Sequence, residues 1–211
     1  MKKTRLGFLV SHRGTNMQAI IDSCRKGDLN AEPVAVVTNN ESCQALQRAR
    51  QQSIPSYVAN TRVCADTNSS PDDYILQKLF EHQVELLVLA GYMKKIGASI
   101  TSAFAGRIMN IHPSLLPKYG GKGMFGLHVH EAVLAAGDTE TGVTIHLVDE
   151  EYDQGPVLAQ AKVSVEPGDT PETLAARVLK TEHRLLIETL KGVLHGDIAT
   201  GLIEIDPTRT R

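Results

Sequence analysis

The stretch Val84-Glu85-Leu86-Leu87-Val88-Leu89-Ala90 decides the fold. Six of its seven side chains are apolar, and Gly91 follows it directly. A short and almost continuous apolar run is typical of a β-strand covered on both faces, as a central strand of a parallel sheet is. Because parallel strands need long crossover connections, which are usually helical, we expect helices before and after this strand.

Short apolar runs and longer amphipathic segments alternate on both sides of residues 84–90, which favours an α/β fold. Before this strand, we predict strands over 6–10, 34–37 and 57–59, helices over 17–24, 44–52 and 72–82, and a polar surface loop over 60–73 that enters the last of these helices. After it, we predict a central strand over 107–112, a short helix over 128–136, an antiparallel strand pair over 142–148 and 157–165, and a long final helix over 171–194. The sequence therefore predicts a mostly parallel sheet flanked by helices, with a C-terminal antiparallel strand pair.

Size and composition limit the class of protein. The chain has 211 residues, and at roughly 150 residues per domain we expect one domain over 1–196 and a tail over 197–211. Its formal net charge of −2 lacks the basic excess typical of nucleic-acid-binding proteins. No apolar run approaches the ~20 residues of a membrane span. Three cysteines without metal-like spacing suit a reducing compartment, so we expect a cytoplasmic protein that binds neither nucleic acid nor membrane.

The loop Ser11-His12-Arg13-Gly14-Thr15-Asn16 connects the first predicted strand to the first predicted helix. Ligands of open parallel sheets collect beyond the carboxyl ends of the strands, where this loop would lie. The free N–H groups and the dipole of a helix N-terminus attract anions, and Arg13 or Thr15 can assist. The alternative is a hydrophilic turn in which Thr15 or Asn16 caps the helix.

Asn110 and His112 are candidates for catalysis. They stand two positions apart at the end of the predicted strand 107–112, so they project from the same face at its C-terminal end. A carboxamide and an imidazole together can stabilise an oxyanion, and the imidazole can also transfer a proton near neutral pH. The alternative is that both side chains only satisfy backbone groups at the end of a strand.

The loop 149–155 carries four carboxylates, most of which we expect to be solvated. One that turned toward His112 would raise the pKa of the imidazole, and spacing does not select which one. A metal site is not expected, because His128 and His130 at i and i+2 of a helix do not share a face and no Cys or Glu completes a familiar ligand set with His112.

Glu182 is an acidic residue in an apolar setting. On the predicted final helix it falls within the arc of Leu174, Val178 and Leu185. A carboxylate on a core-facing stripe needs a partner or a ligand. A salt bridge at the rim of the stripe is the alternative.

Several motifs, in the same order along the chain, resemble those of the folate-dependent formyltransferases. Asn110-Ile111-His112-Pro113-Ser114-Leu115-Leu116-Pro117 is similar to the family signature, and the loop 149–155 to its second signature, with Asp153 at the acidic position. Further similar segments are Ala90-Gly91-Tyr92-Met93, the phosphate loop Gly14-Thr15-Asn16-Met17-Gln18-Ala19, and Thr181-Glu182-His183. The resemblance covers about residues 5–195.

The resemblance implies a Rossmann-like sheet and an enzyme that moves the formyl group of its co-substrate 10-formyltetrahydrofolate to an amine, without a metal. The motifs are most similar to those of members that formylate glycinamide ribonucleotide in purine synthesis. A phosphate-binding half would extend to about residue 105, and a folate-binding and catalytic half would cover about 106–196.

The resemblance also implies roles for individual residues. Asn110 and protonated His112 would hydrogen-bond the oxyanion of the tetrahedral intermediate, and Asp153 would keep His112 charged. Gly14, Thr15 and Asn16 would hold the phosphate, and Glu182 would contact the glycinamide end. The folate would lie against Met93, Lys94, Lys95, Ile96, Asn110, Asp149, Glu150, Glu151, Tyr152 and Asp153.

Four departures from the family pattern concern the substrates. His12-Arg13 replaces small residues before the loop glycine, and Lys94 stands where the family commonly has Arg. The family's folate-binding Arg is missing, with Asn68 nearby by spacing. The segment Gly120–Gly126 is longer than the family turn, and we expect it to form a mobile flap over the substrate.

Three other functions remain open at this point. The amine could belong to an amino-sugar nucleotide or to charged initiator tRNA, although members acting on tRNA normally carry an additional domain. Water could replace the amine, which would make the protein a 10-formyltetrahydrofolate hydrolase. The chain could also be a phosphometabolite-binding sensor without turnover. Either a monomer or a homodimer is compatible with the sequence.

Overall fold

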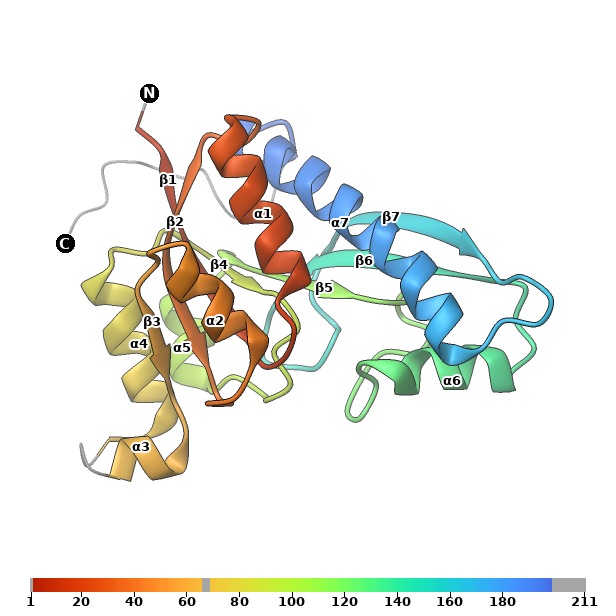
Figure 1. Ribbon diagram of the computed structural model, residues 1–211, viewed down its shortest axis with the longest axis horizontal. Helices are drawn as coiled ribbons and strands as arrows, with labels where there is room; N and C mark the ends of the chain where they lie inside the picture. Colours follow the sequence, from red (N-terminus) through yellow and green to blue (C-terminus); the bar gives the residue numbers. More distant parts are fainter. Residues whose placement is uncertain (1, 66–68, 199–211) are drawn as a thin grey trace.

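The protein, described by a computed structural model over residues 2–65 and 69–198, is built on one sheet. Its strands are β1 (Thr4–Val10), β2 (Ala31–Thr38), β3 (Ser56–Val58), β4 (Leu86–Leu89), β5 (Ile108–His112), β6 (Glu140–Leu147) and β7 (Val157–Ser164). They lie in the order β3-β2-β1-β4-β5-β6-β7 (Figure 1). β1 to β5 pair in parallel, whereas β6 is antiparallel to both β5 and β7. The predicted mostly parallel sheet with an antiparallel strand pair is confirmed.

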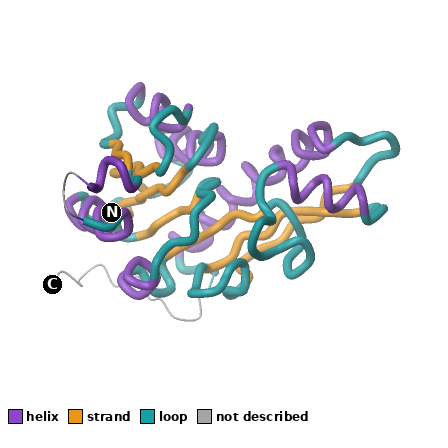
Figure 2. The backbone as a smooth tube through the Cα atoms, turned by 90° about the horizontal axis from the view of Figure 1, so that it is seen from below, coloured by secondary structure: helices purple, strands orange, loops and turns teal. Residues whose placement is uncertain are grey.

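Helices cover both faces of this sheet, as Figure 2 shows. They are α1 (Thr15–Lys26), α2 (Gln44–Gln51), α3 (Thr61–Ala65), α4 (Pro71–Glu81), α5 (Ala98–Ala103), α6 (Leu127–Ala135) and α7 (Pro171–His195). The alternation of side chains along β4 divides the core. Leu86 and Val88 pack with apolar residues of α1, α2 and α7, whereas Leu87 and Leu89 pack with those of α4 and α5. No helix in the described part of the chain is long and apolar enough to cross a membrane.

The predicted surface loop over 60–73 is wrong in part, because it contains α3 and the beginning of α4. Asn60 and Ser70, two of the polar residues that suggested a loop, are helix caps. Asn60 Oδ1 accepts the N–H of Val63 at 2.9 Å, and Ser70 Oγ accepts the N–H of Asp73 at 3.1 Å. Such side chains satisfy N–H groups that the first turn of a helix leaves free. Asn68 and the tail from residue 199 onward lie outside the described residues.

Hydrogen bonds at the end of β1 hold together the loops that follow three neighbouring strands. The buried Ser11 Oγ donates to Asn39 Oδ1 at 2.6 Å and accepts the N–H of Met93 at 2.8 Å. Asn40 Nδ2 donates to the Ser11 carbonyl at 3.1 Å. The loops after β1, β2 and β4 are therefore fixed relative to one another at the C-terminal edge of the sheet.

Candidate active site

A cavity of about 770 Å³ lies where the loops after β1, β4, β5 and β6 meet α7. The site residues expected from the sequence that line it are Thr15, Asn16, Met93, Lys94, Lys95, Ile96, Asn110, His112, Asp149, Glu150, Glu151, Tyr152, Asp153 and Glu182. Gly14 is the only expected site residue outside this lining. It is the N-cap of α1 in a left-handed conformation with φ of 66°, so it shapes the loop through its backbone.

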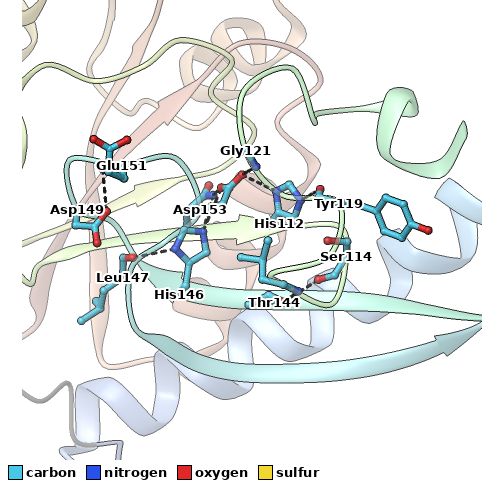
Figure 3. Close-up of polar contacts among 12 residues, drawn as sticks. His112, Ser114, Tyr119, Gly121, Thr144, His146, Leu147, Asp149, Glu151 and Asp153 are labelled. Carbon is cyan, nitrogen blue, oxygen red and sulfur yellow. Dashed lines mark hydrogen bonds and ion pairs between the residues drawn. The ribbon is translucent and has the colours of Figure 1, made fainter. Parts of the chain in front are cut away.

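Asn110, His112 and Asp153 meet at one end of the cavity. His112 Nδ1 lies 3.6 Å from Asp153 Oδ2, and Asn110 Nδ2 lies 3.5 Å from Asp153 Oδ1. The Asp153 side chain is only 10% exposed, and its Oδ2 accepts the N–H of Gly121 at 2.8 Å (Figure 3). The carboxylate selected by the resemblance is therefore the one that turns toward the imidazole.

His146 is a member of this group that was not expected from the sequence. It stands opposite Asn110 in the register of β5 with β6, and its Nε2 accepts from Asn110 Nδ2 at 3.0 Å. Its Nδ1 donates to the Leu147 carbonyl at 2.8 Å, and its Nε2 lies 3.5 Å from Asp153 Oδ1. The available signal was a polar pair, Thr144 and His146, at i and i+2 of a predicted strand.

Burial and charge act in opposite directions on the groups of this site. Burial raises the pKa of Asp153, but the adjacent imidazole of His146, the charge that His112 carries when protonated and the Gly121 N–H outweigh it, so the net pKa lies below its usual range. For His112, burial lowers the pKa, and the opposing effects of Asp153 and the Tyr119 carbonyl do not restore it. The net pKa of His112 therefore lies below its usual range although Asp153 raises it, and the expectation that Asp153 keeps His112 charged during the reaction stays a prediction.

Asn16 and Glu182 meet in another part of the cavity. Asn16 Nδ2 donates to Glu182 Oε2 at 2.6 Å, joining α1 to α7. Burial raises the pKa of Glu182 more than this hydrogen bond lowers it. Asn16 is 8% exposed, and its Oδ1 has no hydrogen-bond partner. The pair has unused acceptor capacity beside Thr15 and Arg13, which also line the cavity.

Apolar and basic side chains line a further stretch of the wall. Lys95 Nζ lies 5.5 Å from the ring centroid of Tyr152, which joins the loop after β4 to the loop after β6. The glycine-rich segment lines the cavity from Gly121 through Gly126, including Met124 and Phe125. Its position fits the expected flap, whose movement stays a prediction. No three His, Cys, Asp or Glu residues are grouped to hold a metal ion within residues 2–65 and 69–198.

The chain is similar to known proteins of one family. The sequence matches the family described as "Formyl transferase" over residues 4–190. It is 41% identical over 196 residues to phosphoribosylglycinamide formyltransferase of Haemophilus influenzae, covering 93% of this chain and 89% of that protein. It is 40% identical to the chloroplastic phosphoribosylglycinamide formyltransferase of Arabidopsis thaliana, with 91% of this chain covered. The chain spans 66% of that plant relative and 62% of the one from Vigna unguiculata.

The fold is also found among solved structures. Glycinamide ribonucleotide transformylase 1 from Symbiobacterium toebii superposes with a TM-score of 0.85 at 34% identity, covering 92% of this chain and 89% of that one. Phosphoribosylglycinamide formyltransferase from Bacillus halodurans superposes with a TM-score of 0.82 at 38% identity, covering 90% of this chain and 95% of that one. The chain therefore belongs to the formyl transferase family of enzymes.

Proposed function

We propose that this enzyme transfers the formyl group of 10-formyltetrahydrofolate to the amine of glycinamide ribonucleotide. One observation carries the proposal: a single cavity joins the group Asn110, His112 and Asp153 to the loop at the N-terminus of α1. The names of the similar proteins indicate the same amine substrate. A phosphorylated amine and a formyl donor can thus meet in one enclosed space, which is the first requirement for transfer between them.

In this proposal the phosphate binds where Gly14, Thr15 and Asn16 begin α1. The free N–H groups and the dipole of that helix end favour an anion. Glu182, held by Asn16 at 2.6 Å, contacts the glycinamide end. The carboxylate offers an acceptor to an N–H group, and its contact with Asn16 fixes its orientation.

The folate binds against the loop after β4, residues 93–96, and the loop after β6, residues 149–153. Both loops line the cavity, and the Lys95–Tyr152 contact joins them. This placement directs the formyl group toward Asn110 and His112. The chemistry that follows needs no metal.

The amine nitrogen attacks the formyl carbon, and the formyl oxygen takes the negative charge. His112 accepts the amine proton, and the imidazolium so formed donates a hydrogen bond to that oxygen. Asn110 Nδ2 donates a second hydrogen bond to it. For this, Asn110 gives up its 3.5 Å contact with Asp153, which is weaker than its contact with His146. Collapse of the intermediate breaks the bond to N10 of the folate, and the proton passes from His112 to N10. Asp153 stabilises the imidazolium. Each oxyanion donor contributes ~10²–10³ in rate.

An assay with purified protein and 10-formyltetrahydrofolate, with and without glycinamide ribonucleotide, tests this proposal. We expect tetrahydrofolate to form only when the amine is present, in equal amount to the formylated product. Tetrahydrofolate formed without the amine would indicate a hydrolase. Binding of the ribonucleotide without turnover would indicate a sensor.

The choice of amine is tested with matched substrates in the same assay. Glycinamide riboside, which lacks only the phosphate, should have a much higher KM, because the loop before α1 loses its anion. An amino-sugar nucleotide should be a poor substrate. Preference for the amino-sugar nucleotide would overturn the assignment of the amine while leaving formyl transfer intact.

A further inference from the structure

The imidazole of His112 is held on the side away from Asp153 by a backbone carbonyl. His112 Nε2 lies 2.8 Å from the Tyr119 carbonyl oxygen, while Nδ1 faces Asp153 (Figure 3). A carbonyl oxygen can only accept a hydrogen bond. The Asp153 carboxylate is also only an acceptor, but at 3.6 Å it lies beyond hydrogen-bond distance. The single proton of a neutral ring therefore lies on Nε2, which leaves Nδ1 without a proton.

The backbone of Tyr119 has an unusual conformation that exposes this carbonyl. Its φ of 58° lies in the left-handed region, which non-glycine residues rarely adopt. Such a conformation persists only where neighbouring contacts determine it. At Tyr119 these contacts come from the side chain, which points away from His112 in Figure 3.

The phenol of Tyr119 is anchored to the turn after α6. Tyr119 Oη donates to Asp138 Oδ2 at 2.7 Å. Lys118 forms an ion pair with the same carboxylate, and its Nζ lies 5.2 Å from the Tyr119 ring centroid. The Lys118 carbonyl accepts from Ser114 Oγ at 2.6 Å. These contacts fix the positions of both Lys118 and Tyr119.

We propose that Tyr119 and Asp138 are positioning residues that set the tautomer of His112, so that Nδ1 is the ring nitrogen that exchanges protons with the substrates. Asp138 accepts a hydrogen bond from the Tyr119 phenol, and this contact fixes the backbone of Tyr119. The Tyr119 carbonyl in turn accepts the hydrogen bond that keeps the proton on His112 Nε2. This catalytic consequence rests on the proposed function, but the tautomer does not.

The consequence for catalysis is a basic nitrogen beside Asp153, in the lining of the cavity. A bare Nδ1 can accept the amine proton, and the imidazolium then presents Nδ1–H next to Asp153. If the carbonyl moved, the proton could shift to Nδ1, and the ring would present a donor where the reaction needs an acceptor. Turnover would fall although both substrates still bind.

NMR of the ligand-free protein with ¹⁵N-labelled histidine tests the tautomer directly, at a pH where His112 is neutral. We expect the Nε2–H form in the native protein and a mixture of both forms in Tyr119→Phe, which lacks only the hydroxyl. The Nδ1–H form in the native protein, or an unchanged tautomer in Tyr119→Phe, would overturn the proposal. Tyr57→Phe is the matched control, because its hydroxyl also makes a short contact, 2.6 Å from His82 Nε2, but on β3.

Kinetics then test the catalytic consequence. For Tyr119→Phe we expect kcat to fall about tenfold with KM values within about twofold, since misplacement of a catalytic group lowers turnover more than binding. Asp138→Ala should have the same effect, and Asp138→Asn, which keeps an acceptor oxygen, should restore most of kcat. Equal kcat in the native protein and both disruptive variants would overturn the role of the pair. The expected tautomer in a protein without formyl transfer would overturn the proposed function alone.

Discussion

Two glycines at opposite ends of α1 allow a test of how tightly the loop before α1, the proposed phosphate loop, is packed. Gly14 precedes the helix with φ of 66°, and Gly27 follows it with φ of 82°. Both have left-handed backbone conformations, so alanine is strained at either position. Only their surroundings differ. A Cβ on Gly14 would lie 2.6 Å from Ala45 Cβ and 3.0 Å from Ala45 Cα, whereas a Cβ on Gly27 would have no atom within 4 Å.

The two alanine variants should therefore differ by the energy of this contact. The left-handed conformation costs an L-residue roughly 1–2 kcal/mol, which applies to both. Overpacking adds roughly 1–3 kcal/mol at Gly14. Ala45 cannot easily withdraw, because its N–H donates to the His12 carbonyl at 3.0 Å. We expect Gly14→Ala to lower the free energy of unfolding by about 2–5 kcal/mol and Gly27→Ala by about 1–2 kcal/mol.

Urea denaturation of the two variants and the native protein measures this difference. Thermal unfolding should agree, at about 2–4 °C per kcal/mol for a chain of this size. Gly14→Ala should also weaken binding of the phosphorylated amine, which Gly27→Ala should leave unchanged. Equal losses of stability in the two variants would refute the close packing of α2 against the phosphate loop.

Three further predictions concern His112 and His130, two histidines that line the cavity. His112→Ala should lower kcat by about 10²–10³ while largely sparing phosphate binding, measured by kinetics and calorimetry; near-normal turnover would contradict the oxyanion assignment. Asp153→Asn should lower the pKa of His112 still further, because the carboxylate charge raises it; an unshifted NMR titration would contradict their coupling. Burial, with a smaller effect of His112, lowers the pKa of His130 to about 4. As pH falls from about 6.5, His130 therefore takes up a proton in the unfolded chain before it does so in the folded protein. The free energy of unfolding should fall by up to about 3 kcal/mol near pH 4 for this reason. Urea denaturation of His130→Gln should show a smaller fall, and an identical fall would contradict this account.

The position of Asn110 and His112 could be predicted because it depends only on local rules. Strand period places the two side chains on one face, and the end of a parallel strand places them where ligands bind. Glu182 could likewise be identified, because a carboxylate on an apolar helix face needs a partner, which Asn16 supplies. The choice of Asp153 came from the family resemblance, since solvation of a loop carboxylate is not visible in its spacing.

His146 shows what local rules leave out. The strand that contains it was predicted, and its polar neighbour Thr144 shares its face. The pairing that sets His146 opposite Asn110 depends on the register of β5 with β6. A shift of one residue would turn its side chain to the other face. Register is set by packing across the sheet and by the connection between the strands, so the sequence pattern alone does not determine it.

The charge of His112 depends on the balance between the cost of burying an imidazolium and its attraction to Asp153. Neither the sequence motif nor the contact distance reveals this balance. At 3.6 Å and an effective dielectric constant of about 20, the attraction between an imidazolium and Asp153 is about 4–5 kcal/mol. Removing an ion from water costs several kcal/mol as well, and the net lowering of the pKa means that burial prevails. In the proposed reaction His112 first receives the amine proton, a role that suits a neutral imidazole. An oxyanion formed beside it adds a second negative charge, which tips the balance toward the imidazolium at the step that needs it. The same residue can therefore act first as a base and then as a donor without any change in its position.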